Sequence, residues 1–237
     1  MSLSAHLSTF LLSQQTDNTV CFGFSASLKN WLEAQRDVLK KRERTSLSLQ
    51  IAGCDLLDRE SLSQLTVSKL CKEAGIAQGT FYLHFQDRHD FVSHLLQAYI
   101  AFLQVQMKQA SQYESEDSVR ATTAAYYHLF EANLGLMKCL IHHLEDFPET
   151  REAFLWLNRE WADSVTHSTM KRWKSKGITQ PFSQEDLQIR AYALGGLVDQ
   201  YLNVLLLHKD PYLKSLSDDK EAVIDSLSDI WKRGLAL

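Results

Sequence analysis

The chain has 237 residues, with 9 Gly and 3 Pro where average usage would supply about 17 and 12. A protein built from many short strands needs more turn residues than this, so the composition excludes an all-β fold and predicts an all-α fold. Its 45% hydrophobic and 23% charged residues are typical of a globular protein, and a net charge of −4 argues against nonspecific nucleic-acid binding by the chain as a whole.

The cysteines and the apolar stretches exclude several further classes of protein. Four cysteines, at positions 21, 54, 71 and 139, show neither CxxC spacing nor a His partner at ligand spacing, so no zinc site or disulfide framework is expected. No apolar stretch is long enough to cross a membrane, and the first basic residue is Lys29, which argues against a secretory signal. These features predict a reduced, cytoplasmic protein with no membrane segment, metal or cofactor.

The first thirty residues are nearly uncharged and can form either a short amphipathic helix or a poorly ordered tail. A helix is expected over residues 28–41, with Ser27 as its N-cap. Residues 29–44 carry six basic and three acidic side chains, whereas the chain from residue 45 onward has a net charge of −6. Basic charge is therefore concentrated in one early segment, ahead of an acidic body. The apolar positions of the possible first helix are Leu3, Leu7, Phe10 and Leu11.

Helical periodicity continues along the rest of the chain. After an apolar stripe over residues 46–57, two short helices are expected at 63–74 and 78–85, separated at Gly75, and a long one follows to about residue 110. The total is about nine helices with no convincing strand. Later helix boundaries are expected at Asp117, Pro148, Gly177, Ser183, Pro211 and Asp218 or Asp219.

The two short helices within residues 66–85 form the pattern of a helix-turn-helix, with a basic stretch upstream. Ala74 and Gly75 permit a tight turn, and apolar residues on the inner face can lock the second helix against the first. The other face of the second helix is then free to enter a major groove. Gln78 can pair with an adenine edge through its amide, and the Thr80 hydroxyl can reach a base or a phosphate.

Residues 49–91 resemble the DNA-binding domain of the tetracycline-repressor (TetR) family. The resemblance lies in the Ala-Gly turn, a short recognition helix and the ending GTFYLHF, which is followed by Arg88 where the family has a Lys. Ser46, Ser61 and Leu65 depart from the family pattern, and Arg42 and Arg44 are close enough to replace a phosphate-facing Arg at position 46. The resemblance implies DNA contacts for Arg42, Arg44, Thr66, Gln78, Gly79, Thr80, Tyr82, His84 and Arg88.

The same resemblance implies an effector pocket and a dimer interface in the later helices. Aromatic residues at helical spacing fit a pocket but are more often part of a plain core. The penultimate helix is apolar nearly all round and contains Gly195 and Gly196, which favours a symmetric four-helix interface between two copies. The expected pocket residues are Tyr126, Tyr127, Phe130, Trp156, Trp161 and His167. The expected interface residues are Leu194, Leu197, Val198, Tyr201, Leu205, Ile224, Leu227 and Trp231.

These patterns predict an N-terminal extension over residues 1–39, a helix-turn-helix domain over 40–90 and a helical effector and dimerisation domain over 91–237. The expected function is that of a homodimeric, ligand-responsive repressor that binds a double-stranded DNA operator and a small-molecule effector. Two alternatives remain. One is a helical small-molecule-binding or interaction module without operator binding, favoured by the acidic body and by Ser46. The other, an enzyme, is disfavoured because the nine His residues are scattered and no catalytic motif is present.

Overall fold

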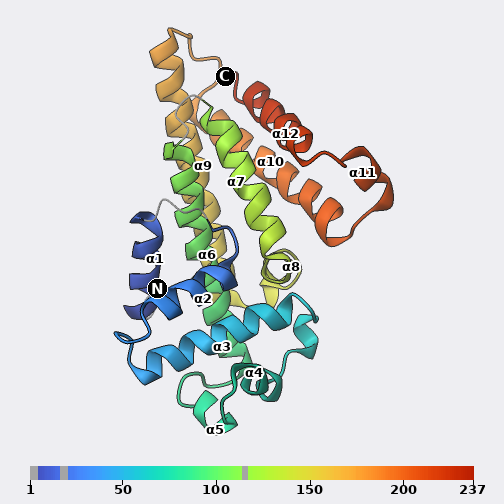
Figure 1. The fold of residues 1–237 in the computed structure, drawn as a ribbon. Helices are drawn as coiled ribbons and strands as arrows, with labels where there is room; N and C mark the ends of the chain where they lie inside the picture. The colour runs from blue at the N-terminus through green and yellow to red at the C-terminus, as the bar shows by residue number, and fades with distance from the viewer. Residues whose placement is uncertain (1–4, 17–20, 114–116) are drawn as a thin grey trace. The chain divides into compact units, whose positions relative to one another are not determined.

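A computed structural model describes residues 5–16, 21–113 and 117–237 (Figure 1). Within these ranges the chain forms twelve α-helices and no strand, which confirms the all-α prediction. The number exceeds the expected nine partly because of two short helices, α1 (Ala5–Thr16) and α11 (Pro211–Leu216). Pro211 was expected only to close a helix, but it also occupies the first position of α11, where its missing N–H costs nothing. None of the described helices is long and apolar enough to cross a membrane.

The chain divides into two compact units, and the divisions fall inside the long helices α6, α7 and α9. Unit 1 comprises Met1–Gln109 and His128–Ala153, and unit 2 comprises Ala110–Tyr127 and Phe154–Leu237. The units do not follow the predicted domains, whose boundaries stay a prediction. The remaining helices are α2 (Phe24–Ala34), α3 (Lys41–Leu57), α4 (Val67–Ala74), α5 (Gln78–Phe81), α6 (Arg88–Tyr113), α7 (Ser118–Ala132), α8 (Leu134–His142), α9 (Pro148–Lys176), α10 (Gln184–Leu202) and α12 (Lys220–Gly234).

The N-terminal segment of unit 1 is helical and packed rather than a loose tail. Phe10 of α1 contacts Phe24 and Trp31 of α2, with ring centroids 6.2 and 5.6 Å apart, and Phe24 lies 5.2 Å from Phe102 of α6. Burying four aromatic rings in one cluster accounts for the order of the segment, since each ring buries a large apolar area. Leu3, part of the expected stripe, lies outside the described residues.

The single helix expected over residues 28–41 is wrong. Helix α2 begins after Gly23 and ends at Ala34, and α3 begins at Lys41. The start of α2 is held by Asn133, whose Oδ1 accepts a hydrogen bond of 2.7 Å from the Phe24 N–H. The start of α3 is capped by Glu43, whose carboxylate accepts a 2.7 Å bond from the Lys40 N–H. No Gly or Pro lies between the two helices. The capping hydrogen bond at Lys40 marks where α3 begins.

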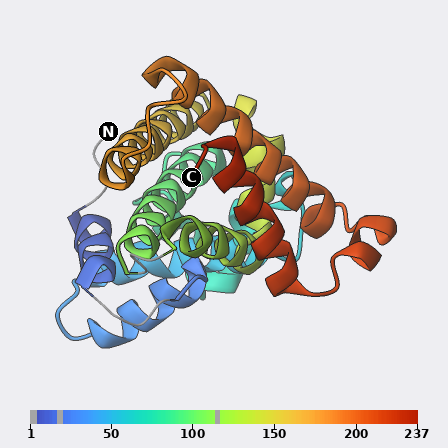
Figure 2. The same cartoon turned by 90° about the horizontal axis from the view of Figure 1, so that it is seen from above.

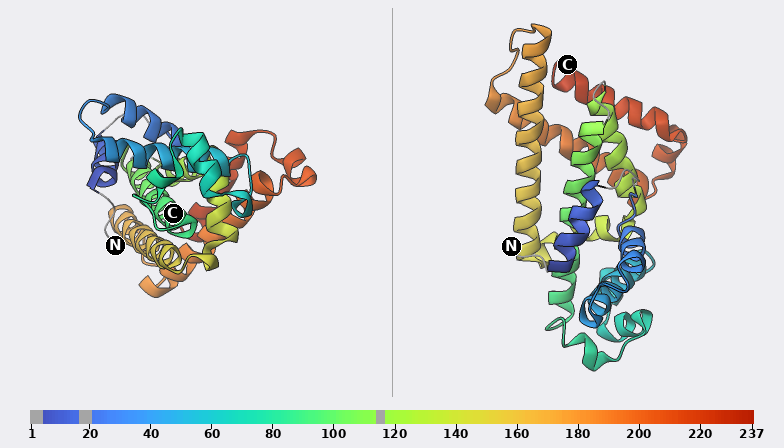
Figure 3. Two further views of the ribbon diagram at one scale, coloured as in Figure 1. Left: turned by 90° about the horizontal axis from the view of Figure 1, so that it is seen from below. Right: turned by 60° about the vertical axis from the view of Figure 1, so that its left-hand side comes forward.

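The helix-turn-helix of unit 1 consists of α4 and α5, packed beneath α3 (Figure 3). Thr66 caps α4 by accepting a hydrogen bond from the Lys69 N–H at 3.2 Å. Gly75 ends α4 with a φ of 68°, a conformation that favours glycine, as the sequence predicts. The first helix is shorter than the expected 63–74 because residues 62–64 form a separate 3-10 turn. The second is regular only as far as Phe81.

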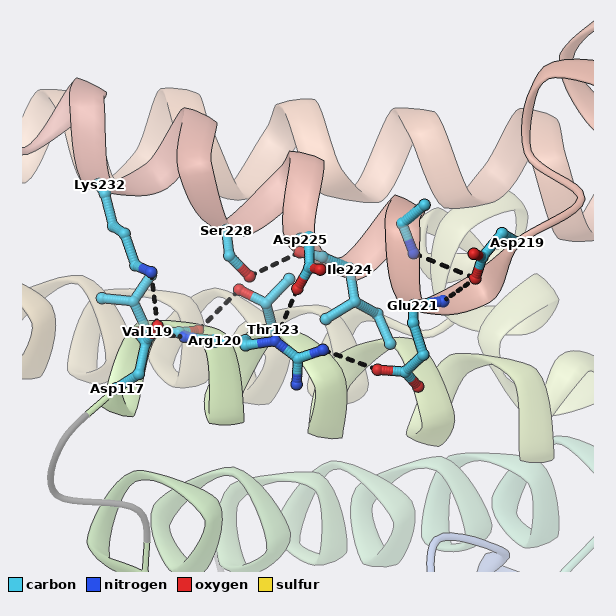
Figure 4. Close-up of polar contacts among 11 residues, drawn as sticks. Asp117, Val119, Arg120, Thr123, Asp219, Glu221, Ile224, Asp225, Ser228 and Lys232 are labelled. Carbon is cyan, nitrogen blue, oxygen red and sulfur yellow. Dashed lines mark hydrogen bonds and ion pairs between the residues drawn. The ribbon is translucent and has the colours of Figure 1, made fainter.

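In unit 2, α10 and α12 lie side by side (Figure 2). The predicted capping box opens α10, where Ser183 Oγ accepts a bond from the Asp186 N–H. Trp231 of α12 meets Trp161 of α9 edge-on at 5.1 Å. Arg120 of α7 donates to Glu221 at 2.7 Å and to Asp225 at 2.6 Å on α12 (Figure 4). These aromatic and ionic contacts tie α12 to α7 and α9.

Candidate nucleic-acid interface

The recognition segment exposes polar side chains over a buried aromatic base. Gln78 and Gly79 are exposed, Thr80 is half-buried and Tyr82 is 57% exposed. In contrast, Phe81 is fully buried, and its ring centroid lies 5.9 Å from that of Phe91 on α6. The aromatic base therefore fixes the segment while its outer face stays free to contact another molecule.

The helical winding continues past the regular part of α5. The N–H groups of His84 and Phe85 both donate to the Phe81 carbonyl, at 2.9 and 3.0 Å, and the Leu83 N–H donates to the Thr80 carbonyl at 3.2 Å. Residues 78 and 82 therefore share one side of the segment, and residues 79 and 83 share the next. The helical winding therefore places Gln78 and Tyr82 on a common outer face.

The two arginines at the start of α3 point to different places. Arg42 is exposed, and its Nη2 donates to the Leu83 carbonyl at 3.2 Å, which places a guanidinium at the end of the recognition segment. Arg44 instead donates through Nη1 to the Arg36 carbonyl at 2.8 Å and lines a groove of about 490 Å³ between α2 and α3. Of this predicted pair, only Arg42 lies next to the recognition segment.

Arg88 holds the backbone turn that precedes Thr66. The Arg88 guanidinium is half-buried, and its Nη1 donates to the carbonyls of Leu62 and Leu65 at 2.9 and 3.4 Å. This arrangement holds the turn that precedes Thr66, the exposed cap of α4. Arg88 is thus placed to position Thr66, and a direct phosphate contact of its own stays a prediction.

His84 is the titratable group of the recognition segment. Burial lowers the pKa of its imidazole, and the neighbouring Arg42 guanidinium lowers it further. The neutral form of His84 is therefore favoured near pH 7, where its ordinary pKa would already leave it mostly uncharged. A contact between His84 and a phosphate would then be a neutral hydrogen bond, and the charge on this surface comes from the lysines and arginines.

Comparison with known proteins identifies this segment. Residues 52–95, which include all of α4 and α5, match the sequence profile described as "Bacterial regulatory proteins, tetR family". This segment is therefore similar to the DNA-binding segment of the tetR family.

Curated relatives agree with the profile match. The HTH-type transcriptional regulator SAB2452 of Staphylococcus aureus (strain bovine RF122 / ET3-1) is 27% identical over 108 residues, which are 45% of this chain and 56% of the relative. An HTH-type transcriptional regulator of strain USA300 is 26% identical over the same shares of the two chains. The chain thus spans about half the length of these curated relatives.

Solved structures share the fold over most of the chain. The fatty acid degradation regulator FadR from Bacillus halodurans has a TM-score of 0.62 and 19% identity, covering 78% of this chain and 93% of its own. The transcriptional regulator FadR from Bacillus subtilis, solved in complex with stearoyl-CoA, has a TM-score of 0.62 and 16% identity, covering 78% of this chain and 96% of its own. At these identities the likeness establishes the fold.

The expected effector residues differ in burial. Tyr127 and Phe130 are buried, and Phe130 belongs to unit 1 while the other five belong to unit 2. Trp156 is 52% exposed and His167 is also exposed. Tyr126 makes a side-chain hydrogen bond to Asp199 of α10. Its hydroxyl donates to the Asp199 carboxylate at 2.5 Å, and burial raises the pKa of that carboxyl while the hydrogen bond opposes the rise.

Most of the expected dimer residues pack inside their own protomer. Val198, Leu205, Ile224, Leu227 and Trp231 are each at most 7% exposed. Leu194 and Tyr201 are half-buried, and only Leu197 is largely open, at 41%. Because α10 is apolar nearly all round, periodicity could not separate its inner face from its outer one.

A second set of apolar side chains on the same two helices is exposed and was missed from the sequence. Ile189 is 61% exposed and Tyr192 is 47% exposed on α10, and Ile230 is 40% exposed on α12. With Leu197, the α10 residues surround Gly196, where an added Cβ would meet nothing within 4 Å. We call Ile189, Tyr192, Gly196, Leu197 and Ile230 the outer face of α10 and α12. The neighbouring Gly195 faces inward, where an added Cβ would lie 3.2 Å from Trp161.

The exposed cations Lys40, Lys41 and Arg42 predict a salt effect on DNA binding. Replacing all three by Ala should weaken binding to every DNA sequence alike. The slope of log affinity against log salt should become shallower by roughly one for each phosphate that the variant no longer neutralises. The matched control replaces three exposed lysines of α9, Lys171, Lys174 and Lys176, which changes the net charge equally. Fluorescence anisotropy with labelled DNA at several salt concentrations measures the slopes, and equal slopes for the two variants would contradict the prediction.

Proposed function

We propose that this protein is a transcriptional regulator of the tetR type that binds DNA sequence-specifically, acts as a homodimer and works as a ligand-responsive repressor. The observation that carries the proposal is the recognition segment within the matched residues 52–95, whose polar residues face outward over a buried aromatic base. The HTH-type transcriptional regulators that match this chain support the same function.

The proposed binding mode follows from the chemistry of the exposed groups. Gln78 would pair with an adenine edge through its amide, and Thr80 would contact a base or a phosphate through its hydroxyl. Thr66, Tyr82 and Arg42 would bind phosphates, which sets the register of the segment on the duplex but carries no sequence information. Gly79 leaves the middle of the outer surface without a side chain, so the backbone can come close to the DNA.

A homodimer supplies two recognition segments for a palindromic site. Half-sites one turn apart require the two segments to lie about 34–36 Å from each other. The outer face of α10 and α12 supports the dimer, because it exposes four large apolar side chains around an open glycine. We assign the dimer contact to this face in place of the buried residues expected from the sequence.

A small-molecule effector completes the proposal. The Tyr126–Asp199 pair supports an effector site in unit 2, since it places a half-buried polar pair among apolar helices. An effector that binds more tightly to a form unable to bind DNA would release the operator by as much as its preference for that form. As a bacterial regulatory protein, the chain would work in the cytoplasm and would not be an enzyme.

Selection of bound sites from a random DNA pool tests the proposed function. We expect a palindromic site with half-sites about one helical turn apart. Gln78→Ala and Thr80→Ala should each weaken binding to that site by about 5- to 150-fold, the range for removing one base contact, and should leave binding to scrambled DNA unchanged. The matched controls are Gln180→Ala and Thr179→Ala, which remove exposed side chains of the same types from the loop before α10.

The competing function gives a different result. A helical module that binds small molecules without an operator would enrich no site from the pool. Equal affinity of the folded protein for selected and scrambled DNA would also overturn the proposed function. Circular dichroism of each variant separates these outcomes from a loss of folding.

A further inference from the structure

A leucine stands out at the end of the recognition segment. Leu83 is 70% exposed, although Phe81 and Phe85, two positions before and after it, are 0% and 6% exposed. A buried leucine side chain is favoured by roughly 1.5–3 kcal/mol over an exposed one. Leu83 contributes none of this stabilisation to the protein core.

The backbone of Leu83 is held on both sides. Its N–H donates to the Thr80 carbonyl at 3.2 Å, and its carbonyl accepts a 3.2 Å bond from Arg42 Nη2. The Cα–Cβ direction is therefore set by the fold, and little backbone freedom remains to be lost on binding. Arg42 also brings a positive charge to the residue that carries the exposed leucine.

The surface beside Leu83 is open. Gly79 lies four residues earlier, on the same side of the helical winding, and an added Cβ at Gly79 would meet nothing within 4 Å. Thr80, three residues earlier, borders the same side. The isobutyl group therefore projects past a glycine, so a base edge that approached Gly79 would meet Leu83 next.

We propose that Leu83 is a specificity-determining residue that recognises a thymine of the operator through its C5-methyl group. The proposal rests on the proposed function of DNA binding. A leucine side chain has no donor or acceptor, and the apolar feature that base pairs present in the major groove is the thymine methyl. The other three bases offer only polar edges there, so contact with Leu83 favours thymine at one position of each half-site.

The experiment uses the full chain and the DNA site selected from the random pool. Each thymine of one half-site is replaced in turn by deoxyuridine, which removes the methyl group and leaves the hydrogen-bonding edge unchanged. For the native protein we expect one position at which this replacement weakens binding about fourfold, the effect of one buried methyl-sized group. Leu83→Ala should bind the thymine site about as weakly as the native protein binds the deoxyuridine site, and it should show no further loss with deoxyuridine.

Two further variants separate this contact from general effects. Leu83→Met keeps an apolar side chain of similar volume and should retain the sensitivity to the methyl group. Val38→Ala is the matched control, because Val38 is 79% exposed on the turn between α2 and α3 and is not part of the recognition segment. Its deoxyuridine profile should equal that of the native protein. Thermal melting confirms that all three variants fold.

The outcomes distinguish the failure of this inference from the failure of the proposed function. If no site is selected, the proposed function fails. If a site is selected but Leu83→Ala keeps the deoxyuridine sensitivity of the native protein, another residue recognises the methyl group. A native profile without any sensitive thymine also overturns the inference, as does a Leu83→Ala variant that loses affinity equally for thymine and deoxyuridine sites, which would indicate contact with the sugar-phosphate backbone.

Discussion

Gly135→Ala is expected to lower the free energy of unfolding by about 3 kcal/mol, the upper part of the range for overpacking a core. Gly135 lies in the first turn of α8, and an added Cβ would lie 2.4 Å from the carbonyl carbon and oxygen of Leu57 and 2.7 Å from the Asp58 nitrogen. These are backbone atoms at the end of α3, so they cannot rotate away as a flexible side chain would. Relief requires α3 and α8 to separate, and both helices belong to unit 1.

The same displacement would also disturb a partly buried hydrogen bond. The Gly135 N–H donates to the Asp58 carboxylate at 3.0 Å. Burial raises the pKa of that carboxyl, and the bond from Gly135 partly offsets the rise by favouring its charged form. If the helices move apart, Asp58 loses this partner while part of its burial remains. The loss adds to the steric cost and acts in the same direction.

Urea denaturation followed by circular dichroism measures the effect, at equal protein concentrations because a dimer couples stability to concentration. The matched control is Gly79→Ala, since an added Cβ at Gly79 meets nothing within 4 Å. Alanine there should change stability by no more than about 1 kcal/mol, and in the stabilising direction, because it reduces the freedom of the unfolded chain. If the two variants unfold at the same urea concentration, the steric argument for Gly135 is wrong.

Local features of this fold were predictable from the sequence. The turn at Gly75, the cap at Thr66 and the capping box at Ser183 each depend on residues within a few positions of one another. The recognition segment was found for the same reason, since its spacing and its exposed polar residues lie within one short stretch. The structure places these features where the patterns indicate.

Features that depend on distant contacts were not predictable. The start of α2 depends on Asn133, more than a hundred residues later in the chain, and the break between α2 and α3 lacks the Gly or Pro that would mark it in the sequence. The close approach of Gly135 to Leu57 joins two helices that nothing in the local sequence connects. The two sides of α10 are both apolar, so only the packing of α9 and α12 shows which side is left exposed.

The exposed side of α10 is the basis of a prediction for the proposed dimer. Ile189→Asp combined with Leu197→Asp should convert the dimer to a monomer and raise the dissociation constant at least about a thousandfold. An unpaired charge buried in an apolar contact costs several kcal/mol, and a symmetric interface contains every substitution twice. Both residues are more than 40% exposed in the protomer, so the double variant should still fold. Sedimentation velocity over a range of concentrations measures the change.

The matched control is Leu155→Asp combined with Trp156→Asp on α9, where two apolar side chains are 46% and 52% exposed. This variant carries the same added charge, away from the outer face of α10 and α12, and should remain a dimer. A monomeric regulator engages only one half-site, so the α10 variant should also lose most of its affinity for a palindromic operator while keeping that for a single half-site. If the α10 variant remains a dimer and the α9 variant does not, the interface lies on α9 and the outer face of α10 and α12 has a different role.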